Sequence, residues 1–253
     1  MNILIINHYA GSDKMGMVFR TYYFAKEWVK MGHQVAIVAA DFSHLRQVNP
    51  EVTEDLQSEC IDGINYYWII AGEYHGNGVN RALSMLRFSG KLLKYKNEII
   101  KRTSPDIVIA TSMYQFDSYP ARKIADKAHA KYIHEVRDMW PITLMELSNM
   151  SSRHPFVMAV QTFENYAYKH ADAVVSLLKN AKSYMMQHGL KPEKFYYVPN
   201  GVLKEEWEAQ NIEALEPGKS QQIMEFKSRF HNIVGFFGSV NITDGLEEVI
   251  EAA

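Results

Sequence analysis

Four ionisable side chains sit together at the end of one apolar run, Lys131–Val136. They are His134, Glu135, Arg137 and Asp138. Charged groups at the carboxyl end of a buried strand are costly unless they are paired or used. A carboxylate beside an arginine stays ionised and can accept a proton from a hydroxyl group. We therefore interpret the cluster as functional. The alternative is a structural Arg137–Asp138 ion pair beside a core histidine.

Two glycine-bearing segments also follow apolar runs. Gly11 and Gly16 follow the first run of the chain, and Gly238 with Ser239 follows the last. Glycine lets the backbone approach a ligand closely, and a helix that comes next offers free N–H groups to a phosphate. A plain strand-to-helix turn is the alternative in both places. Neither segment is a G-x-G-x-x-G or a G-x-x-x-x-G-K-[ST] motif, so a nicotinamide or P-loop site is disfavoured.

A third segment, Pro199-Asn200-Gly201, ends another apolar run. Alone it predicts a turn, because proline fixes φ and Asn-Gly tolerates positive φ. At a domain junction the same turn can serve as a hinge. The sequence contains no H-E-x-x-H, no G-x-S-x-G and no Asp-x-Asp pair after a strand. We therefore expect neither a metal nor a cofactor.

These groups are positioned by an alternation of apolar runs and amphipathic stretches. A βαβ unit opens the chain, with Gly32 as the C′ glycine of its helix, and it predicts a right-handed crossover and a parallel sheet. The predicted strands are Asn2–Asn7, Gln34–Ala39, Ile64–Ala71, Asp106–Ala110, Lys131–Val136, Ala173–Leu177 and Phe195–Val198. The predicted helices are Val18–Met31, Gly78–Arg102, Ser118–Ala128, Phe156–His170 and Ala181–His188. The pattern predicts an α/β fold with a doubly wound, Rossmann-like parallel sheet.

The character of the sequence changes after residue 202. Residues 1–202 form the predicted Rossmann-like domain, and the charged residues 203–231 a linker with a connecting helix. Residues 232–253 predict one strand, Asn232–Phe237, and one helix, Gly245–Ala253. A single strand and helix cannot bury their own apolar faces. We therefore expect an incomplete second domain, and a chain that is a fragment of a longer protein.

Composition excludes several classes of protein. The 253 residues carry a net charge of -2 with histidines neutral, so no basic field predicts a nucleic-acid partner. Cys60 is the single cysteine, which excludes an internal disulfide. The sequence has no signal-peptide pattern and no apolar run long enough to span a membrane. The stretch Arg81–Arg102, rich in arginine, lysine and leucine, is either a solvated helix face or a surface for anionic lipid.

Four segments, taken in their order along the chain, resemble family-4 retaining glycosyltransferases of the GT-B fold. Within that family they resemble the bacterial enzymes of capsule and O-antigen polysaccharide assembly. They are INHYAGSDKMG, EVRDMWP, FYYVPNGV and VGFFGSVNITDGLEEVIEAA. The resemblance runs over the whole chain. It implies that residues 1–202 are the acceptor-binding domain of such an enzyme, and that residues 232–253 are the first βα unit of a truncated donor-binding domain.

The resemblance also implies roles for single residues. Asp138, His134 and Arg137 would be catalytic, with the choice between His134 and Asp138 left open, because relatives often carry a His-Asp pair where this chain has Arg137-Asp138. Other residues would bind the substrate or the donor phosphates. They are Gly11, Gly16, Glu135, Asn200, Gly238 and Ser239.

The implied activity is transfer of a hexosyl-type sugar from a nucleotide-diphospho-sugar to a lipid-linked or saccharide acceptor in cell-surface polysaccharide biosynthesis. Relatives hold the donor with a C-terminal domain that uses basic residues and an E-x7-E element. We expect that region to lie outside these 253 residues, and we therefore expect no transfer by this polypeptide alone. The expected location is the cytoplasm, either free or in contact with the cytoplasmic face of the membrane. The alternatives are a non-catalytic α/β nucleotide- or partner-binding module and, weaker, a nucleotide-sugar epimerase or dehydrogenase, which the missing dinucleotide fingerprint disfavours.

Overall fold

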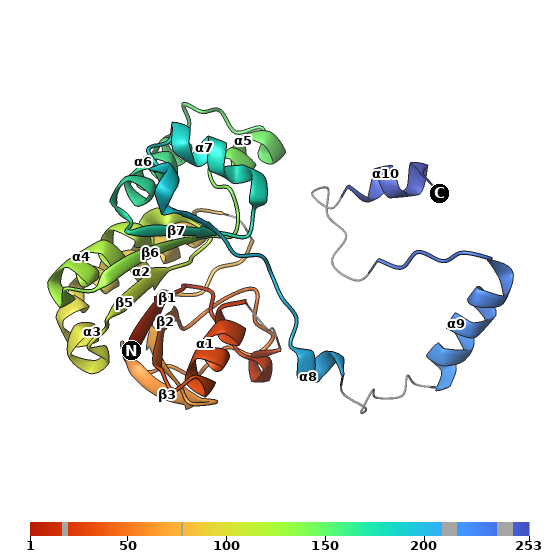
Figure 1. Cartoon of the computed structure of the whole chain (residues 1–253), viewed down its shortest axis with the longest axis horizontal. Helices are drawn as coiled ribbons and strands as arrows, with labels where there is room; N and C mark the ends of the chain where they lie inside the picture. The colour runs from red at the N-terminus through yellow and green to blue at the C-terminus, as the bar shows by residue number, and fades with distance from the viewer. Residues whose placement is uncertain (17–19, 77, 209–216, 237–244, 253) are drawn as a thin grey trace. The chain divides into compact units, whose positions relative to one another are not determined.

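A computed structural model describes residues 1–16, 20–76, 78–208, 217–236 and 245–252 of the chain. The chain divides into two compact units, Met1–Gly201 and Val202–Ala253. The first unit contains a twisted sheet with helices on both faces, as Figure 1 shows. This unit carries the predicted 134–138 cluster.

Among the described residues, eight strands form one sheet in the order β3-β4-β2-β1-β5-β6-β7-β8. Their bounds are β1 Asn2–Ile6, β2 Gln34–Ala40, β3 Gln57–Ile61, β4 Ile64–Ile69, β5 Ile107–Ala110, β6 Lys131–Val136, β7 Ala173–Ser176 and β8 Phe195–Tyr197. Neighbouring strands are parallel except for β3 and β4. Strand order reverses at β1, where Ile3 lies opposite both Val35 and Ile107. The predicted doubly wound, Rossmann-like α/β fold is confirmed.

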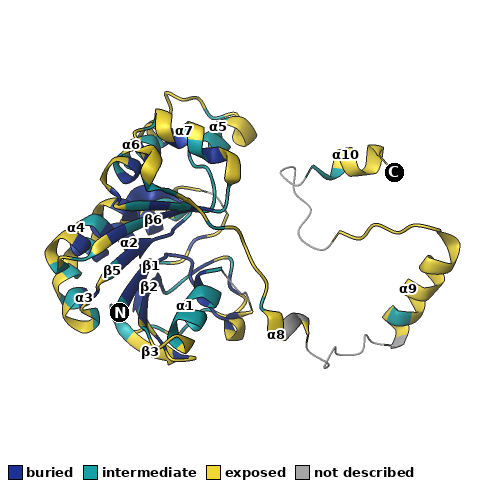
Figure 2. Ribbon diagram, viewed as in Figure 1, coloured by how far each residue is buried: buried dark blue, intermediate teal, exposed yellow. Residues whose placement is uncertain are grey.

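Helices cover the sheet on both sides. In the first unit they are α1 Arg20–Lys30, α2 Val79–Lys94, α3 Lys96–Thr103, α4 Ser118–Ala128, α5 Ile142–Ser148, α6 Pro155–His170 and α7 Lys182–Gln187. Along β1, Leu4 and Ile6 belong to one core cluster, and Ile3 and Ile5 belong to another. Helix α1 packs over β2 and β4, whereas α4 packs over β5 and β6. Figure 2 shows the central strands buried between these layers, as expected for a parallel sheet.

Helix α1 ends where the sequence predicts. Gly32 has φ 84°, a left-handed conformation that favours glycine. Its N–H donates to the carbonyl of Val29 at 2.9 Å, and the N–H of His33 donates to the carbonyl of Trp28 at 3.0 Å. This pair of bonds is the Schellman arrangement, which satisfies the free carbonyls at a helix end.

The structure corrects the predicted helix Gly78–Arg102, which is two helices. Helix α2 ends at Lys94 and α3 begins at Lys96. Between them Tyr95 has φ -96° and ψ 8°, and its N–H still donates to the carbonyl of Lys91 at 2.8 Å. The break redirects the chain so that α3 packs on α4 and β1. Side-chain periodicity did not reveal it, because both halves carry apolar residues at helical spacing.

Two further elements were not predicted. Strand β3 reads QSECI and has three consecutive exposed residues, so it lacks the apolar alternation of a half-buried strand. It forms because it pairs antiparallel with β4 at the edge of the sheet. Helix α5 follows Pro141 and ends at Ser148, and its C-cap residue Asn149 has a φ of 50°. None of its residues is buried.

The second unit contains three helices in its described residues, α8 Lys204–Trp207, α9 Pro217–Arg229 and α10 Leu246–Glu251. The predicted strand Asn232–Phe237 is not formed over residues 232–236, and residue 237 lies outside the described residues. A strand needs a neighbour for its N–H and C=O groups. No paired strand is present in the described part of this unit, and Ile233, Val234 and Phe236 are exposed there.

Candidate functional site

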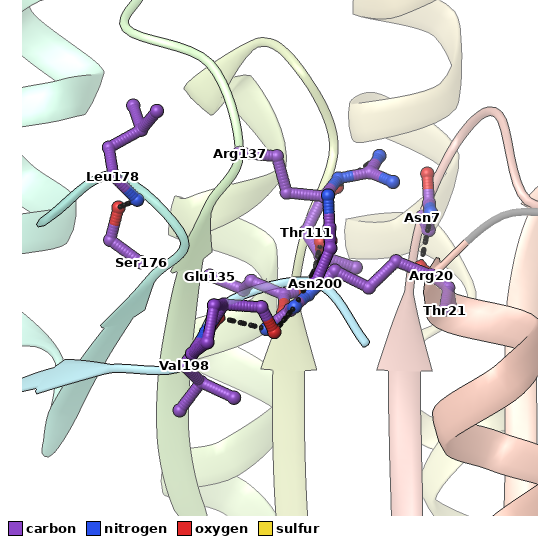
Figure 3. A network of polar contacts seen from close by, with 11 residues as sticks. Asn7, Arg20, Thr21, Thr111, Glu135, Arg137, Ser176, Leu178, Val198 and Asn200 are labelled. Atoms are coloured by element: carbon purple, nitrogen blue, oxygen red, sulfur yellow. Dashed lines mark hydrogen bonds and ion pairs between the residues drawn. The ribbon is translucent and has the colours of Figure 1, made fainter. Parts of the chain in front are cut away.

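A connected group of polar side chains in the first unit lies at the carboxyl ends of β1, β5, β6 and β7. In a doubly wound sheet this edge is where ligands bind, next to the reversal of strand order. Figure 3 shows the side chains converging there from different parts of the sequence. They include Glu135, Arg137 and Asn200, three of the residues predicted from the sequence.

An ion pair between Arg20 and Glu135 forms the centre of this group. Nε of Arg20, at the start of α1, donates to Oε1 of Glu135 at 2.9 Å. The two side chains are only 8% and 10% exposed. The second carboxylate oxygen, Oε2, accepts from Oγ1 of Thr111 at 2.5 Å. Two donors on different elements therefore fix the Glu135 carboxylate in place.

The remaining N–H groups of Arg20 hold the segment that ends the first unit. Nη2 donates to the carbonyl of Val198 at 2.8 Å. Nη1 donates to the carbonyl of Pro199 at 2.7 Å and to Oδ1 of Asn200 at 3.2 Å. The Arg20 guanidinium also lies 4.4 Å from the ring centroid of Phe24. One arginine therefore connects α1, β6 and the Pro-Asn-Gly turn, as Figure 3 shows in part.

Arg137 lies beside this ion pair, and a buried donor of its guanidinium has no partner among the described residues. Its Nη2 donates to the carbonyl of Thr111 at 3.1 Å. Its Nε is buried and has no hydrogen-bond partner among the described residues. Burial lowers the pKa of Arg137, and the carboxylate of Glu135 opposes that shift. A buried N–H without a partner is costly, so this group is suited to donate to a bound ligand.

A cavity of about 300 Å³ adjoins the ion pair on the α1 side of the sheet. Its walls are mostly apolar, and Arg20, Thr111 and Glu135 are among the residues that line it. The others include Ile5, Phe24, Trp28, Ile109, Ile133 and Val175. A largely apolar hollow with a few polar groups at one end is typical of a small-molecule site.

Asp138 is engaged in local bonds. Its Oδ1 accepts from the N–H of Met139 at 2.8 Å and from Oγ1 of Thr143 at 3.1 Å, and its Oδ2 accepts from Nε1 of Trp140 at 3.2 Å. These bonds shape the turn that leads from β6 into α5. The Arg137–Asp138 ion pair considered as an alternative is not the arrangement observed, since Arg137 donates to Thr111 instead.

His134 lies apart from Glu135, because neighbouring residues of a strand point to opposite faces of the sheet. The residue is 1% exposed, and its ring lies 6.0 Å, centroid to centroid, from the ring of Tyr168 on α6. Burial lowers the pKa of His134 to about 4, so the ring is neutral near pH 7. The expectation of a single 134–138 cluster needs correction: the structure places His134 in the core and Glu135 at the ion pair.

The predicted glycine positions differ from one another. Gly11 is buried, and its carbonyl accepts from the hydroxyl of Tyr66 at 2.9 Å. Gly16 is exposed with φ 72°, and a side chain there would collide with that of Gln47. The structure thus requires glycine at position 16 for the turn itself. Gly238 and Ser239 lie outside the described residues.

The sequence interpretation missed Arg20 and Thr111, which complete the site. A signal for Arg20 was present: a cation in the first turn of a predicted helix opposes the helix dipole and calls for another explanation. Thr111 directly follows the run Asp106–Ala110, at the same sheet edge as the predicted cluster. A polar residue at that edge is a candidate for ligand contact in the same way as a charged one.

The fold and site define a Rossmann-like α/β domain of the kind that forms the N-terminal half of GT-B proteins. The sequence matches the family described as Glycosyltransferase Family 4 over residues 15–205, which is more than half of the chain. This chain belongs to glycosyltransferase family 4. The sequence comparison with curated proteins found no match.

Solved structures show the same fold at low sequence identity. Sucrose-phosphate synthase from Thermosynechococcus elongatus aligns with a TM-score of 0.58 and 10% identity, over 80% of this chain and 49% of that one. UGT89C1 from Arabidopsis thaliana, solved in complex with UDP, aligns with a TM-score of 0.50 and 12% identity, over 100% of this chain and 62% of that one. The present chain therefore spans about half the length of the synthase that it matches.

Proposed function

We propose that this chain is the acceptor-binding half, with the start of the donor-binding half, of a retaining enzyme that transfers a sugar from a nucleotide-diphospho-sugar to an acceptor in cell-surface polysaccharide biosynthesis. The observation that carries the proposal is that two groups lie close together: the carboxylate of Glu135, which is held in place, and the buried Nε of Arg137, which has no hydrogen-bond partner among the described residues. Both lie at the ligand-binding edge of the sheet. The UDP bound by the Arabidopsis neighbour supports a nucleotide-linked donor.

In this proposal each group has one task. Glu135 accepts a hydrogen bond from a hydroxyl of the acceptor and orients it, because its oxygens are already held by Arg20 and Thr111. Arg137 donates to an anionic or hydroxyl oxygen through Nε. Asp138 positions the turn that carries Arg137.

The donor phosphates are proposed to meet the loop at Gly16, where backbone N–H groups would stabilise the charge of the leaving phosphate. Asn200, held by Arg20, is proposed to keep the Pro-Asn-Gly turn in place beside the site.

A donor screen on the full-length protein tests the proposal. The release of nucleoside diphosphate is measured with a panel of nucleotide-diphospho-sugars as donors and with acceptor molecules extracted from membranes. We expect turnover with one donor, and a reduction of kcat/KM by about 10²-fold in Glu135→Gln, which keeps the shape of the side chain but loses its charge. Asp138→Asn is expected to have a smaller effect, because an amide oxygen can still accept from Met139 and Thr143.

Glu98→Gln, an exposed residue of α3, is the matched control and should leave turnover unchanged. Donor binding without any release of nucleoside diphosphate would replace this proposal with the non-catalytic binding module. Full activity of Glu135→Gln would remove Glu135 from the site.

We further propose that the protein works at the cytoplasmic face of the membrane, through α2. No helix in the described part of the chain is long and apolar enough to cross a bilayer. Helix α2 nevertheless exposes Val79, Leu83 and Leu86, with relative exposures of 76%, 40% and 53%, and the exposed cation Arg87 lies beside them. Exposed leucines next to basic side chains are typical of helices that lie on anionic lipid.

Co-sedimentation with vesicles checks this contact. The chain is expected to bind phosphatidylglycerol vesicles more than phosphatidylcholine vesicles, and Leu86→Ser or Arg87→Glu should reduce the bound fraction several-fold. Leu147→Ser, an exposed leucine of α5, is the control. Equal binding by all of these variants would show that α2 is a solvated helix face.

A further inference from the structure

Helix α5 is apolar in sequence but buries none of its side chains. Its seven residues, ITLMELS, include Ile142, Leu144, Met145 and Leu147, and Leu147 is 48% exposed. Apolar residues of a short helix normally face the core of the domain. A helix that exposes Leu147 and leaves the other three only partly buried is a candidate binding surface.

One side of α5 borders an open groove of about 390 Å³. Met139 and Ile142 line one wall, and Leu178 and Tyr184 are among the residues of the other. The groove is thus built from hydrocarbon and aromatic surface, within the volume range of small-molecule sites.

A single cation lies in the groove lining. Lys179 is exposed, and its ammonium group has no ion-pair partner within the described ranges of the chain. Its neighbour in the lining is the neutral Asn180, and no carboxylate is among the lining residues. An apolar trough with one available positive charge complements a molecule that has a hydrocarbon chain and an anionic group.

The groove starts next to the proposed site. Met139 follows Arg137 by two residues on the segment that leaves β6. Leu178 follows β7, the neighbour of β6, and its N–H donates to Oγ of Ser176 at 3.0 Å. Figure 3 shows Ser176 and Leu178 on the segment beside Glu135 and Arg137. An anionic group at Lys179 would therefore lie at the same sheet edge as the acceptor-binding carboxylate.

We propose that this groove binds the hydrocarbon chain of a lipid phosphate, with Lys179 contacting the phosphate, so that the acceptor is lipid-linked and not a free saccharide. The claim that the bound lipid phosphate is the acceptor rests on the proposed function. The binding itself can be measured without turnover. A free saccharide would require several planar polar groups along the groove, whereas its walls are mainly Met139, Ile142, Leu178 and Tyr184.

Farnesyl phosphate below its micelle concentration is the probe, with farnesol and inorganic phosphate for comparison. Binding is followed on the 253-residue chain by calorimetry and by the 13C-methyl signals of methionine, which include that of Met139. Farnesyl phosphate is expected to bind most tightly. Ile142→Ser should weaken the binding of both farnesyl phosphate and farnesol by about tenfold. Lys179→Ala should weaken the binding of farnesyl phosphate by about threefold to fivefold and leave that of farnesol unchanged.

Leu147→Ser, on the same helix but outside the groove lining, is the control and should bind as the unchanged chain does. Circular dichroism confirms that each variant folds, which is expected because α5 has no buried residue. Unchanged farnesyl phosphate binding by Ile142→Ser, or inorganic phosphate binding as tight as that of farnesyl phosphate, would overturn the inference. Self-association of the chain that Ile142→Ser abolishes, with no farnesyl phosphate binding, would overturn it in favour of a second copy.

The two proposals can fail separately. If the full-length protein releases nucleoside diphosphate from no donor but the variants change farnesyl phosphate binding as stated, the groove stands and the transferase proposal fails. If turnover is found with a free saccharide acceptor and Ile142→Ser leaves its KM unchanged, the transferase proposal stands and the lipid groove is wrong.

Discussion

Replacement of Arg20 by alanine is expected to lower the free energy of unfolding of the first unit by about 3–5 kcal/mol. The variant leaves the Glu135 carboxylate buried with Thr111 as its remaining side-chain partner. It also removes the donors to the carbonyls of Val198 and Pro199. Removing one partner of a buried ion pair costs more than the pair contributes, because an uncompensated charge stays out of water. Urea denaturation followed by circular dichroism at pH 7 measures the change.

A matched control lies on the same helix. Lys30 forms an exposed pair with Glu27, in which the side chains are 48% and 37% exposed, so Lys30→Ala should cost less than about 1 kcal/mol. Arg20→Ala combined with Glu135→Gln should be less destabilised than the sum of the single changes, since the double variant has no unpaired charge. An additive result would show that the stabilisation comes from the carbonyl contacts alone.

The sequence predicts the sheet because most of its buried strands are largely apolar runs. Asn2–Ile6 and Gln34–Ala40 are recognised on that ground alone, and the Gly-His pair between α1 and β2 indicates the turn. Strand β3 could not be recognised in the same way. Its three exposed central residues carry no burial signal, and its position is set by pairing with β4.

The sequence indicates where the site lies in the fold but not which distant residues come together there. The position of Glu135 and Arg137 at a strand end follows from local pattern, because ligand sites lie at that edge. The partner of Glu135 lies 115 positions earlier in the chain. Only the strand order, in which β1 and β6 flank β5, brings α1 close to it. The opposite facing of His134 and Glu135 follows from strand geometry once β6 is known to continue to Val136.

A pH titration gives the second large effect. Burial lowers the pKa of His134 from 6.5 to about 4, so the folded protein holds the ring neutral while the unfolded chain protonates it. The unfolded state therefore binds more protons between pH 6.5 and 4, and stability is lost as the pH falls through that range. Glutamine cannot titrate in this range. Between pH 6.5 and 4.5 the free energy of unfolding of His134→Gln is therefore expected to fall by about 2–3 kcal/mol less than that of the unchanged chain. Urea denaturation at both pH values gives the difference, with the exposed His75→Gln as control.

Glu164 on α6 provides a second test, because its pKa shift changes stability with pH in the opposite direction from that of His134. Burial raises the pKa of Glu164 from 4.5 to about 7, while hydrogen bonds from Tyr168 and Tyr184 oppose the shift. The folded state then binds more protons than the unfolded chain, so this contribution is present below pH 4.5 and is lost as the pH rises through 7. Glu164→Gln should therefore make the loss of stability on acidification larger, whereas His134→Gln makes it smaller. A general weakening of the core by either substitution would lower both ends of the titration and could not change the slope in opposite directions. Equal slopes in both variants and the unchanged chain would mean that neither group keeps its shifted pKa in the folded protein.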